Sequence, residues 1–159
     1  MDYGKVRLTH EELLFAGQAG SLRRTSAIKA KRHQRWGNTG KNSKGQDILW
    51  DQDIEGCAAE MLVAKATNKY WLPFSNDPRS IKSDVGTNIQ VRHTSRINGC
   101  LLIHPDDPDD QLFFLVTGSN VEMTIKGYIK GVDAKKPEYW KESTGRPCYF
   151  VPQTALIKK

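Results

Sequence analysis

The sequence contains no long hydrophobic run. No apolar stretch in its 159 residues approaches the roughly 18 residues that a membrane-spanning helix needs, and the opening stretch MDYGKVRLTH has no apolar signal core. Cysteine is also scarce. Cys57, Cys100 and Cys148 lie far apart and form no Cys-x-x-Cys pair, so neither a disulfide framework nor a thiolate zinc site is supported. We therefore expect a soluble cytoplasmic protein with free thiols, present as a monomer or homodimer.

Acidic residues are missing from one long stretch, since none occurs between Leu13 and Gln46. The formal net charge of +6 is concentrated there: residues 1–46 carry a net charge of +7, and residues 47–159 carry a net charge of −1. Such a basic block favours a polyanionic partner, and nucleic acid is the commonest one in a cytosol. The alternative is a solvated basic helix and tail that only aids solubility. The residues expected to bind DNA are Arg23, Arg24, Lys29, Lys31, Arg32, Arg35, Lys41 and Lys44.

The first half of the chain has helix signals. Thr9 and Glu12 have the spacing of a capping box, which predicts a helix that begins there and continues or restarts through residues 21–36. A glycine-rich loop follows at residues 37–45. We therefore divide the chain into a basic helical arm with its loop at residues 1–46 and one domain at residues 47–159. Within that domain, the periodicity of residues 51–67 predicts a core helix that ends at Asn68 and lies against a sheet.

The second half of the chain has strand signals instead. Alternating or short apolar runs predict strands at residues 88–94, 101–104, 112–117, 121–129 and 148–151. The first four are expected to form a meander, and the last to close the sheet after a polar connector. Helices followed by strands indicate an α+β fold.

Polar residues on these elements could form one site. Gln90 and Arg92 are two apart in a predicted strand, so they project from the same face, while Ile89 and Val91 point into the core. If Asp84 lies at the mouth of the same sheet and the core helix packs over it, Glu60 completes a cluster of oxygen ligands. Such a cluster suits Mg²⁺ or Mn²⁺ and metal-assisted phosphodiester hydrolysis.

Three short stretches resemble the PD-(D/E)XK, or restriction-endonuclease-like, nuclease superfamily in a small phage-type form. They are GCAAEMLVAKA at 56–66, SDVG at 83–86 and IQVR at 89–92. Later stretches, LLIHPDDPDDQLFFLVTG, IKGYIKG and CYFVPQTAL, look like the sheet of uncharacterised phage and prophage proteins. The resemblance covers residues 50–157 and leaves out the basic arm. It implies a restriction-endonuclease-like core, in which a helix packs on a mixed, mainly antiparallel sheet.

The resemblance also implies roles for the site residues. Glu60 and Asp84 would hold Mg²⁺ or Mn²⁺, Gln90 and the Val91 carbonyl would complete the ligand set, and Arg92 would stabilise the transition state of a DNA nuclease. The sequence departs from the family at two of these positions. Gln90 replaces an acid and adds no negative charge, while Arg92 replaces a lysine and stays protonated, so it cannot act as a base. These departures leave two alternatives open: an inactive DNA-binding protein on the same fold, or a phage protein that binds a host protein.

Two further features are interpreted as structural. The aspartates at 106, 107, 109 and 110 lack the alternating ligands and the glycine of a calcium-binding loop, so we expect a solvated turn. His93 would point to the opposite face of its strand from Arg92, which favours a structural role over proton transfer.

Overall fold

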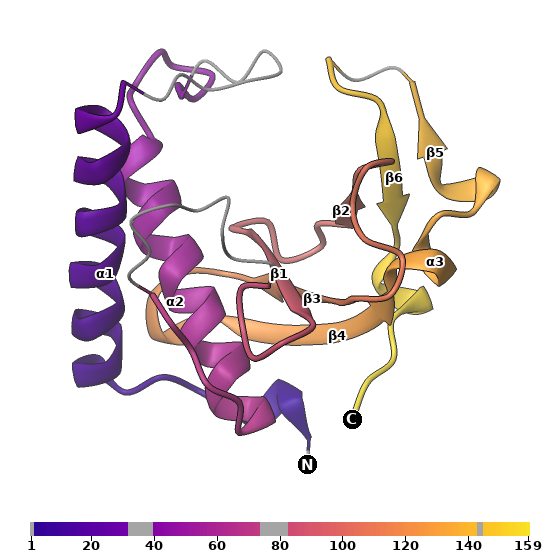
Figure 1. Cartoon of the computed structure of the whole chain (residues 1–159), viewed down its shortest axis with the longest axis horizontal. Helices are drawn as coiled ribbons and strands as arrows, with labels where there is room; N and C mark the ends of the chain where they lie inside the picture. The colour runs from indigo at the N-terminus through magenta and orange to yellow at the C-terminus, as the bar shows by residue number, and fades with distance from the viewer. Residues whose placement is uncertain (1, 32–39, 74–82, 143–144) are drawn as a thin grey trace.

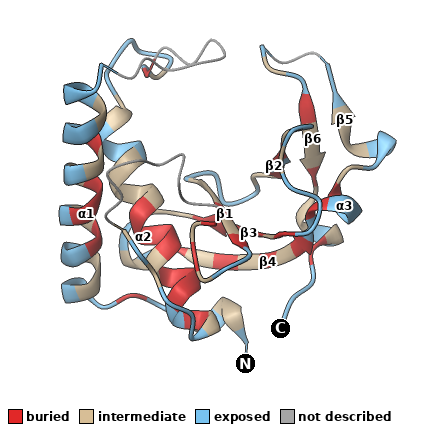
Figure 2. Ribbon diagram, in the orientation of Figure 1, coloured by how far each residue is buried: buried red, intermediate tan, exposed pale blue. Residues whose placement is uncertain are grey.

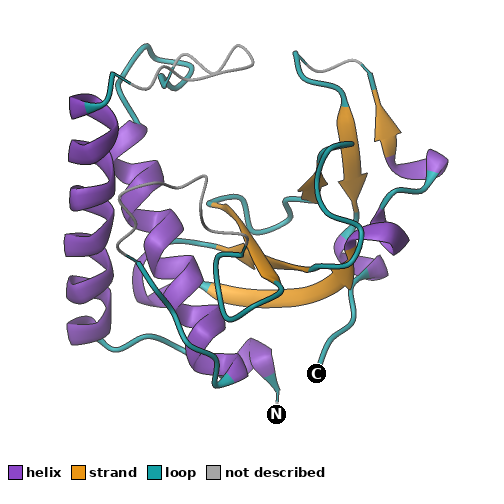
Figure 3. Cartoon of the chain, viewed as in Figure 1, coloured by secondary structure: helices purple, strands orange, loops and turns teal. Residues whose placement is uncertain are grey.

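A computed structural model of the chain describes residues 2–31, 40–73, 83–142 and 145–159 (Figure 1). Its fold is α+β, as the order of the sequence signals predicts (Figure 3). The described part of the chain contains helices α1 (His10–Lys29), α2 (Leu49–Thr67) and the short α3 (Gly131–Ala134), together with two three-stranded sheets. Within these described residues, no helix is both long and apolar enough to cross a bilayer.

Helix α1 begins at the predicted capping box. The Glu12 amide donates to Thr9 Oγ1 at 3.2 Å, and the Thr9 amide donates to Glu12 Oε2 at 2.7 Å. The helix then runs without interruption to Lys29, and Lys31 has a left-handed φ of 48°. It ends earlier than the predicted 36, and residues 32–39 lie outside the described part of the chain.

Helix α2 matches the predicted core helix. It starts two residues earlier than expected, where Asp47 Oδ1 accepts a hydrogen bond of 2.9 Å from the Leu49 amide. It stops at Asn68, whose left-handed conformation with φ 52° ends the helix as predicted. Its buried face is made of small and apolar residues, which allow close packing on α1 and on the sheet: Cys57, Ala58, Ala59, Leu62, Val63 and Ala64.

The first sheet has the strand order β1-β3-β4, formed by β1 (Ile89–Thr94), β3 (Leu112–Thr117) and β4 (Thr124–Lys130). Strand β1 runs parallel to β3, with Ile89 opposite Leu112 and Thr94 opposite Thr117, while β3 and β4 are antiparallel. The sheet is therefore mixed, and β1 forms one of its edges.

The second sheet shows that the predicted meander is wrong. Strand β2 (Leu101–Ile103) does not join β1, because it pairs with β6 (Cys148–Val151), and β6 in turn pairs with the short β5 (Trp140–Lys141). The excursion through β2 gives the chain the length to return for a parallel β1–β3 pair, which a tight hairpin could not connect. Strand β5 lies in the stretch expected to be a connector.

The β1-β3-β4 sheet has an apolar cluster on each face. Helices α1 and α2 cover one face, where Phe114 and Val116 pack with the α2 residues. The other face carries Phe113 and Leu115, which pack with β2 and β6. In Figures 1 and 2 the helices and the second sheet accordingly stand on opposite sides of the first sheet. Strand β3 is buried on both faces, which explains its continuous apolar run LFFLVT.

The inner side of α1 belongs to the first of these clusters. Ala16 and Ala19 are fully buried against α2, Gly20 is buried beside them, and Leu8 precedes the helix in the same cluster. The division of the chain at residue 46 stays a prediction, but in the structure the basic helix packs in the core of the fold. The expectation of free thiols is confirmed: Cys57, Cys100 and Cys148 are all unbridged.

The contact between α1 and α2 at Gly20 predicts a sharp effect of one methyl group. A Cβ at Gly20 would lie 2.4 Å from Ile54 Cα and 2.8 Å from the Asp53 carbonyl oxygen, which are backbone atoms of α2. Overpacking of this kind costs about 1–3 kcal/mol, so Gly20→Ala should lower the free energy of unfolding in urea by that amount.

Gly17→Ala is the matched control one turn earlier on α1. Its Cβ would meet only Ile54 Cγ2, at 3.9 Å, and the change should stabilise the helix by up to about 1 kcal/mol. Equal effects of the two substitutions would contradict the observed packing of the helices.

Candidate functional site

Glu60 lies on α2 with both carboxylate oxygens bonded. Arg23 from α1 donates from two guanidinium nitrogens, at 2.8 Å to Oε1 and 2.9 Å to Oε2. Trp71 Nε1 donates to Oε2 at 3.0 Å. Glu60 is only 8% exposed, and a buried carboxylate needs such partners because burial removes its hydration. The hydrogen bonds with Glu60 raise the pKa of Arg23, so this guanidinium stays charged.

Asp84 lies between α2 and β1, within electrostatic range of Glu60. Its Oδ2 accepts a 2.7 Å hydrogen bond from the Val91 amide. Burial and the negative charge of Glu60 together raise the pKa of Asp84 to about 6, although the Val91 amide and the charges of Arg92 and Arg23 oppose the rise. Glu60 and Asp84 are therefore close enough to interact through their charges, and Arg23 binds Glu60 directly. Arg92 acts on Asp84 only through its charge, and the grouping of these residues into one site stays a prediction.

The Val91 carbonyl faces the same side of β1 as Asp84. The carbonyls of Asn88 and Thr94 accept hydrogen bonds from the amides of Leu112 and Gly118, so even-numbered residues of β1 direct their backbone toward β3. Odd-numbered residues face the opposite way. The amide of Val91 reaches Asp84 on that side, and the Val91 carbonyl points in the same direction. A carboxylate and a backbone carbonyl therefore adjoin at the edge of the sheet.

The side chains of Gln90 and Arg92 share the sheet face away from α2. Gln90 Nε2 donates to Gln111 Oε1 at 2.7 Å. Arg92 donates to Asp107 Oδ1 at 3.0 Å, and its guanidinium carbon lies 5.3 Å from the centre of the Phe113 ring. Ile89 and Val91 point into the core on the other face, as the strand alternation predicts. Gln90 is thus directed toward Gln111 and away from Glu60, which lies on α2 at the opposite face of the sheet.

The basic residues expected to bind DNA fall into three groups. Arg23 pairs with Glu60, and Arg24 is only 7% exposed, with one nitrogen 3.4 Å from Asp53 Oδ2. Arg24 is therefore buried, and Arg23, whose side chain is 32% exposed, is engaged by Glu60. Lys29, Lys31, Lys41 and Lys44 are exposed at the end of α1 and in the segment before α2. Arg32 and Arg35 lie outside the described residues.

The structure adds partners that the sequence pattern missed. Asp107 lies in the predicted turn, where its Oδ2 accepts a hydrogen bond from the His104 amide at 2.8 Å and its Oδ1 holds Arg92. The tendency of aspartate to cap turns was the signal for the first bond, and no local signal indicated the second. His93 Nε2 lies 2.7 Å from the Gly118 carbonyl oxygen, and Nδ1 lies 3.9 Å from Glu55 Oε2, consistent with the structural role expected.

The oxygen atoms at this edge suit a hard divalent cation more than a soft one. Two carboxylates, Glu60 and Asp84, and one carbonyl, Val91, are of the type that Mg²⁺ and Mn²⁺ prefer. Among the described residues, no group of three or more His, Cys, Asp or Glu side chains could hold a metal ion. A cation would therefore rely on two carboxylates and would need Arg23 to give up Glu60.

No protein-family model matches the sequence, and no curated protein matches it. The assignment of function therefore depends on the geometry of this site.

The pKa of Asp84 predicts how stability depends on pH. Because its pKa is higher in the folded protein than its usual value of 3.8, folding favours the protonated form. The stabilising effect is complete below about pH 4 and is lost as the pH rises through about 6. Asp84→Asn keeps an oxygen for the Val91 amide without the charge, so it should raise the free energy of unfolding at pH 7 by about 1–2 kcal/mol.

The measurement is urea unfolding of wild type and variant between pH 4 and pH 7. The gap between the two proteins should widen with rising pH, while Asp110→Asn, which changes an exposed aspartate, should leave the wild-type profile unchanged. A gap that stays constant would mean that neither burial nor the charge of Glu60 raises the pKa of Asp84 in the folded protein.

Proposed function

We propose that the protein is a metal-dependent nuclease that hydrolyses phosphodiester bonds in DNA. The observation that supports this most is that Asp84 bonds the edge of β1 at Val91, where the charge of Glu60 and the charges of Arg92 and Arg23 all act on its carboxylate. Two acids can hold a divalent cation, and two arginines can bind an anionic phosphate. A site with both chemistries suits a phosphodiester substrate.

The proposal includes a restriction-endonuclease-like core. In its favour, a helix that carries an acid packs on a mixed sheet, and the strand bearing Gln90-Val91-Arg92 follows Asp84 in the chain. The strand order β1-β3-β4 and the separate β2-β6-β5 sheet would be this protein's own elaboration of that core. A cytoplasmic, phage-encoded enzyme is part of the same proposal.

Each residue would have a distinct role. Asp84 and Glu60 would hold the ion with the Val91 carbonyl, and the ion, when bound, would supply a Lewis acid that polarises a phosphate oxygen. Arg92 would release Asp107, bind the phosphate and stabilise the negative charge of the phosphate in the transition state. Gln90 would reach the site through its amide oxygen only by releasing Gln111. The exposed lysines Lys29, Lys31, Lys41 and Lys44 would bind the DNA backbone.

Arg23 occupies the place that the cation would take at Glu60. Its bidentate bond neutralises a buried carboxylate that would otherwise be costly to keep charged. A cation that binds Glu60 would provide the same neutralisation, so Arg23 and the ion compete for the same oxygens. The donor set therefore fits Mg²⁺ or Mn²⁺ on condition that Arg23 moves.

A second function, a DNA-binding protein without catalysis, is favoured by one observation. Both oxygens of Glu60 already have donors, and Gln90 supplies no charge, so the ion would gain less from this site than from a site with three free acids. In that case the carboxylates and arginines would serve the stability of the fold, and the exposed lysines alone would carry function.

Cleavage of supercoiled plasmid in the presence of Mg²⁺ or Mn²⁺ tests the proposed activity. Wild type should nick or linearise the plasmid, and a chelator should stop the reaction. Asp84→Asn should lower the rate by on the order of 100-fold or more, because the ion loses its most accessible carboxylate. DNA binding by the same variant should be unchanged, since the lost charge is negative.

The matched control for cleavage is Asp110→Asn, which removes an exposed acid in the turn before β3. If wild type fails to cleave with either ion yet binds DNA with a strong salt dependence, the non-catalytic alternative replaces this proposal. Because α1 is part of the core, the binding contribution of the lysines is best measured by substitution of Lys29, Lys31, Lys41 and Lys44 rather than by truncation.

Competition at Glu60 predicts that Arg23→Gln tightens the binding of Mn²⁺. The change removes a positive charge from Glu60 and should lower the dissociation constant about tenfold, which corresponds to about 1.4 kcal/mol of relieved repulsion. Isothermal titration with MnCl₂ measures this without any cleavage. Lys29→Gln removes the same charge from the exposed end of the same helix and should leave the affinity as in wild type. Equal affinities of wild type and Arg23→Gln would show that Arg23 does not compete with the ion.

A further inference from the structure

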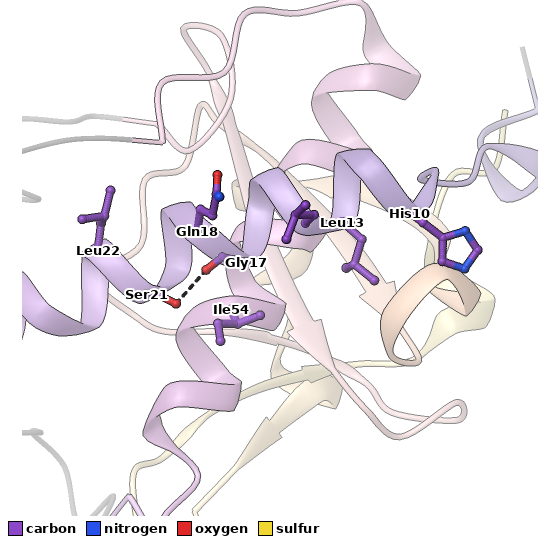
Figure 4. A pocket seen from close by; sticks show the side chains of 8 residues that line it. His10, Leu13, Gly17, Gln18, Ser21, Leu22 and Ile54 are labelled. Atoms are coloured by element: carbon purple, nitrogen blue, oxygen red, sulfur yellow. Dashed lines mark hydrogen bonds between the residues drawn. The ribbon is translucent and has the colours of Figure 1, made fainter.

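The outer side of α1 has an open apolar groove that no part of the proposed site uses. It lies along α1 and reaches Ile54 on α2 (Figure 4). Few side-chain atoms fill the middle of the groove. Gly17 has no side chain, and the Ser21 hydroxyl donates back to the Gly17 carbonyl at 2.9 Å. The groove is therefore a hollow flanked by larger apolar residues.

Two leucines stand beside this hollow with most of their surface in water. Leu14 is 66% exposed and Leu22 is 55% exposed, and Ile28 follows on the same helix with 57%. Single exposed leucines are ordinary, but several along one helix form a patch that favours a partner. Gln18 lies midway between Leu14 and Leu22, so the two leucines are spaced equally on either side of it along the helix.

The two ends of the same face differ in charge. Glu11 is exposed in the first turn of α1, and Lys29 and Lys31 are exposed at its end. No other acid follows Glu12 until the end of the helix. Two copies of α1 laid antiparallel would place the acidic end of each beside the basic end of the other, whereas a parallel arrangement would bring like charges together.

We propose that this face of α1 binds a second copy of the same chain, with the two α1 helices antiparallel about a twofold axis near Gln18. Leu14 of each copy then lies against Leu22 of the other, over the hollow at Gly17 and Ser21. Glu11 comes within about one helical turn of Lys29 in the second copy. A twofold contact of this type is closed, because each copy uses the same surface and none is left for a third.

The charge pattern favours a second copy over other occupants. A nucleic acid would not bury leucines and would be repelled by Glu11. A helix that binds a lipid surface carries basic residues along its whole polar face, whereas the basic residues of this face of α1 are confined to its end. The second copy matches both the apolar middle and the opposite charges of the ends. This inference does not rest on the proposed nuclease activity.

Analytical ultracentrifugation of the full chain at several concentrations tests the proposal. Wild type should show a monomer–dimer equilibrium, and Leu14→Glu or Leu22→Glu should shift it to monomer, weakening association at least about tenfold. The matched control is Ile97→Glu, because Ile97 is also 66% exposed but lies in the loop between β1 and β2. It should dimerise as wild type does.

Charge reversal tests the antiparallel orientation. Glu11→Lys and Lys29→Glu should each weaken the dimer, and the two together in one chain should restore it, because each acidic end again meets a basic end. The proposal is overturned if wild type stays monomeric up to about 1 mM, beyond which association is too weak for a specific interface. It is also overturned if Leu14→Glu dimerises like wild type, or if the double reversal fails to restore association.

Discussion

The bidentate ion pair between Arg23 and Glu60 is the interaction on which this site depends. The Glu60 carboxylate on the buried face of α2 loses its hydration and needs a hydrogen-bonding partner, and that partner comes from a different helix. The pair therefore fixes α1 on α2 and sets the Glu60 carboxylate beside Asp84, whose pKa is raised by burial and by that negative charge. Trp71 completes the coordination of Glu60 and ties the segment after α2 to the same point.

Helix α1 consequently serves three purposes on three parts of its surface. Its inner side supplies Ala16, Ala19 and Arg23 to the core and to the site. Its last turn ends in exposed lysines, and its outer side keeps exposed leucines. The acid-free composition of residues 13–46 suggested a single role, that of a polyanion-binding arm. The packing divides these residues, because two of the basic side chains satisfy acids of α2 instead.

Strand β1 joins the two halves of the molecule. Its backbone bonds to β3 on one side and meets Asp84 on the other, and its side chains alternate between the helix-covered face and the face of the second sheet. Asp84 lies at the edge of the strand and Arg92 on its outer face, so the two side chains interact through their charges and have separate hydrogen-bond partners. A divalent cation and a phosphate could meet at this edge without entering the core.

Local rules determined much of what could be foreseen. The capping box of α1, the left-handed stop at Asn68 and the opposed faces of Val91 and Arg92 all follow from residues within a few positions of each other, where backbone geometry leaves few choices. The sequence alone thus determined the α+β class and the site's strand and helix. The tertiary structure decided the rest: that β2 pairs with β6, that β1 is parallel to β3, and that Arg23 meets Glu60 from 37 positions away. These pairings depend on which distant partner offers burial and opposite charge, and no local pattern specifies that choice.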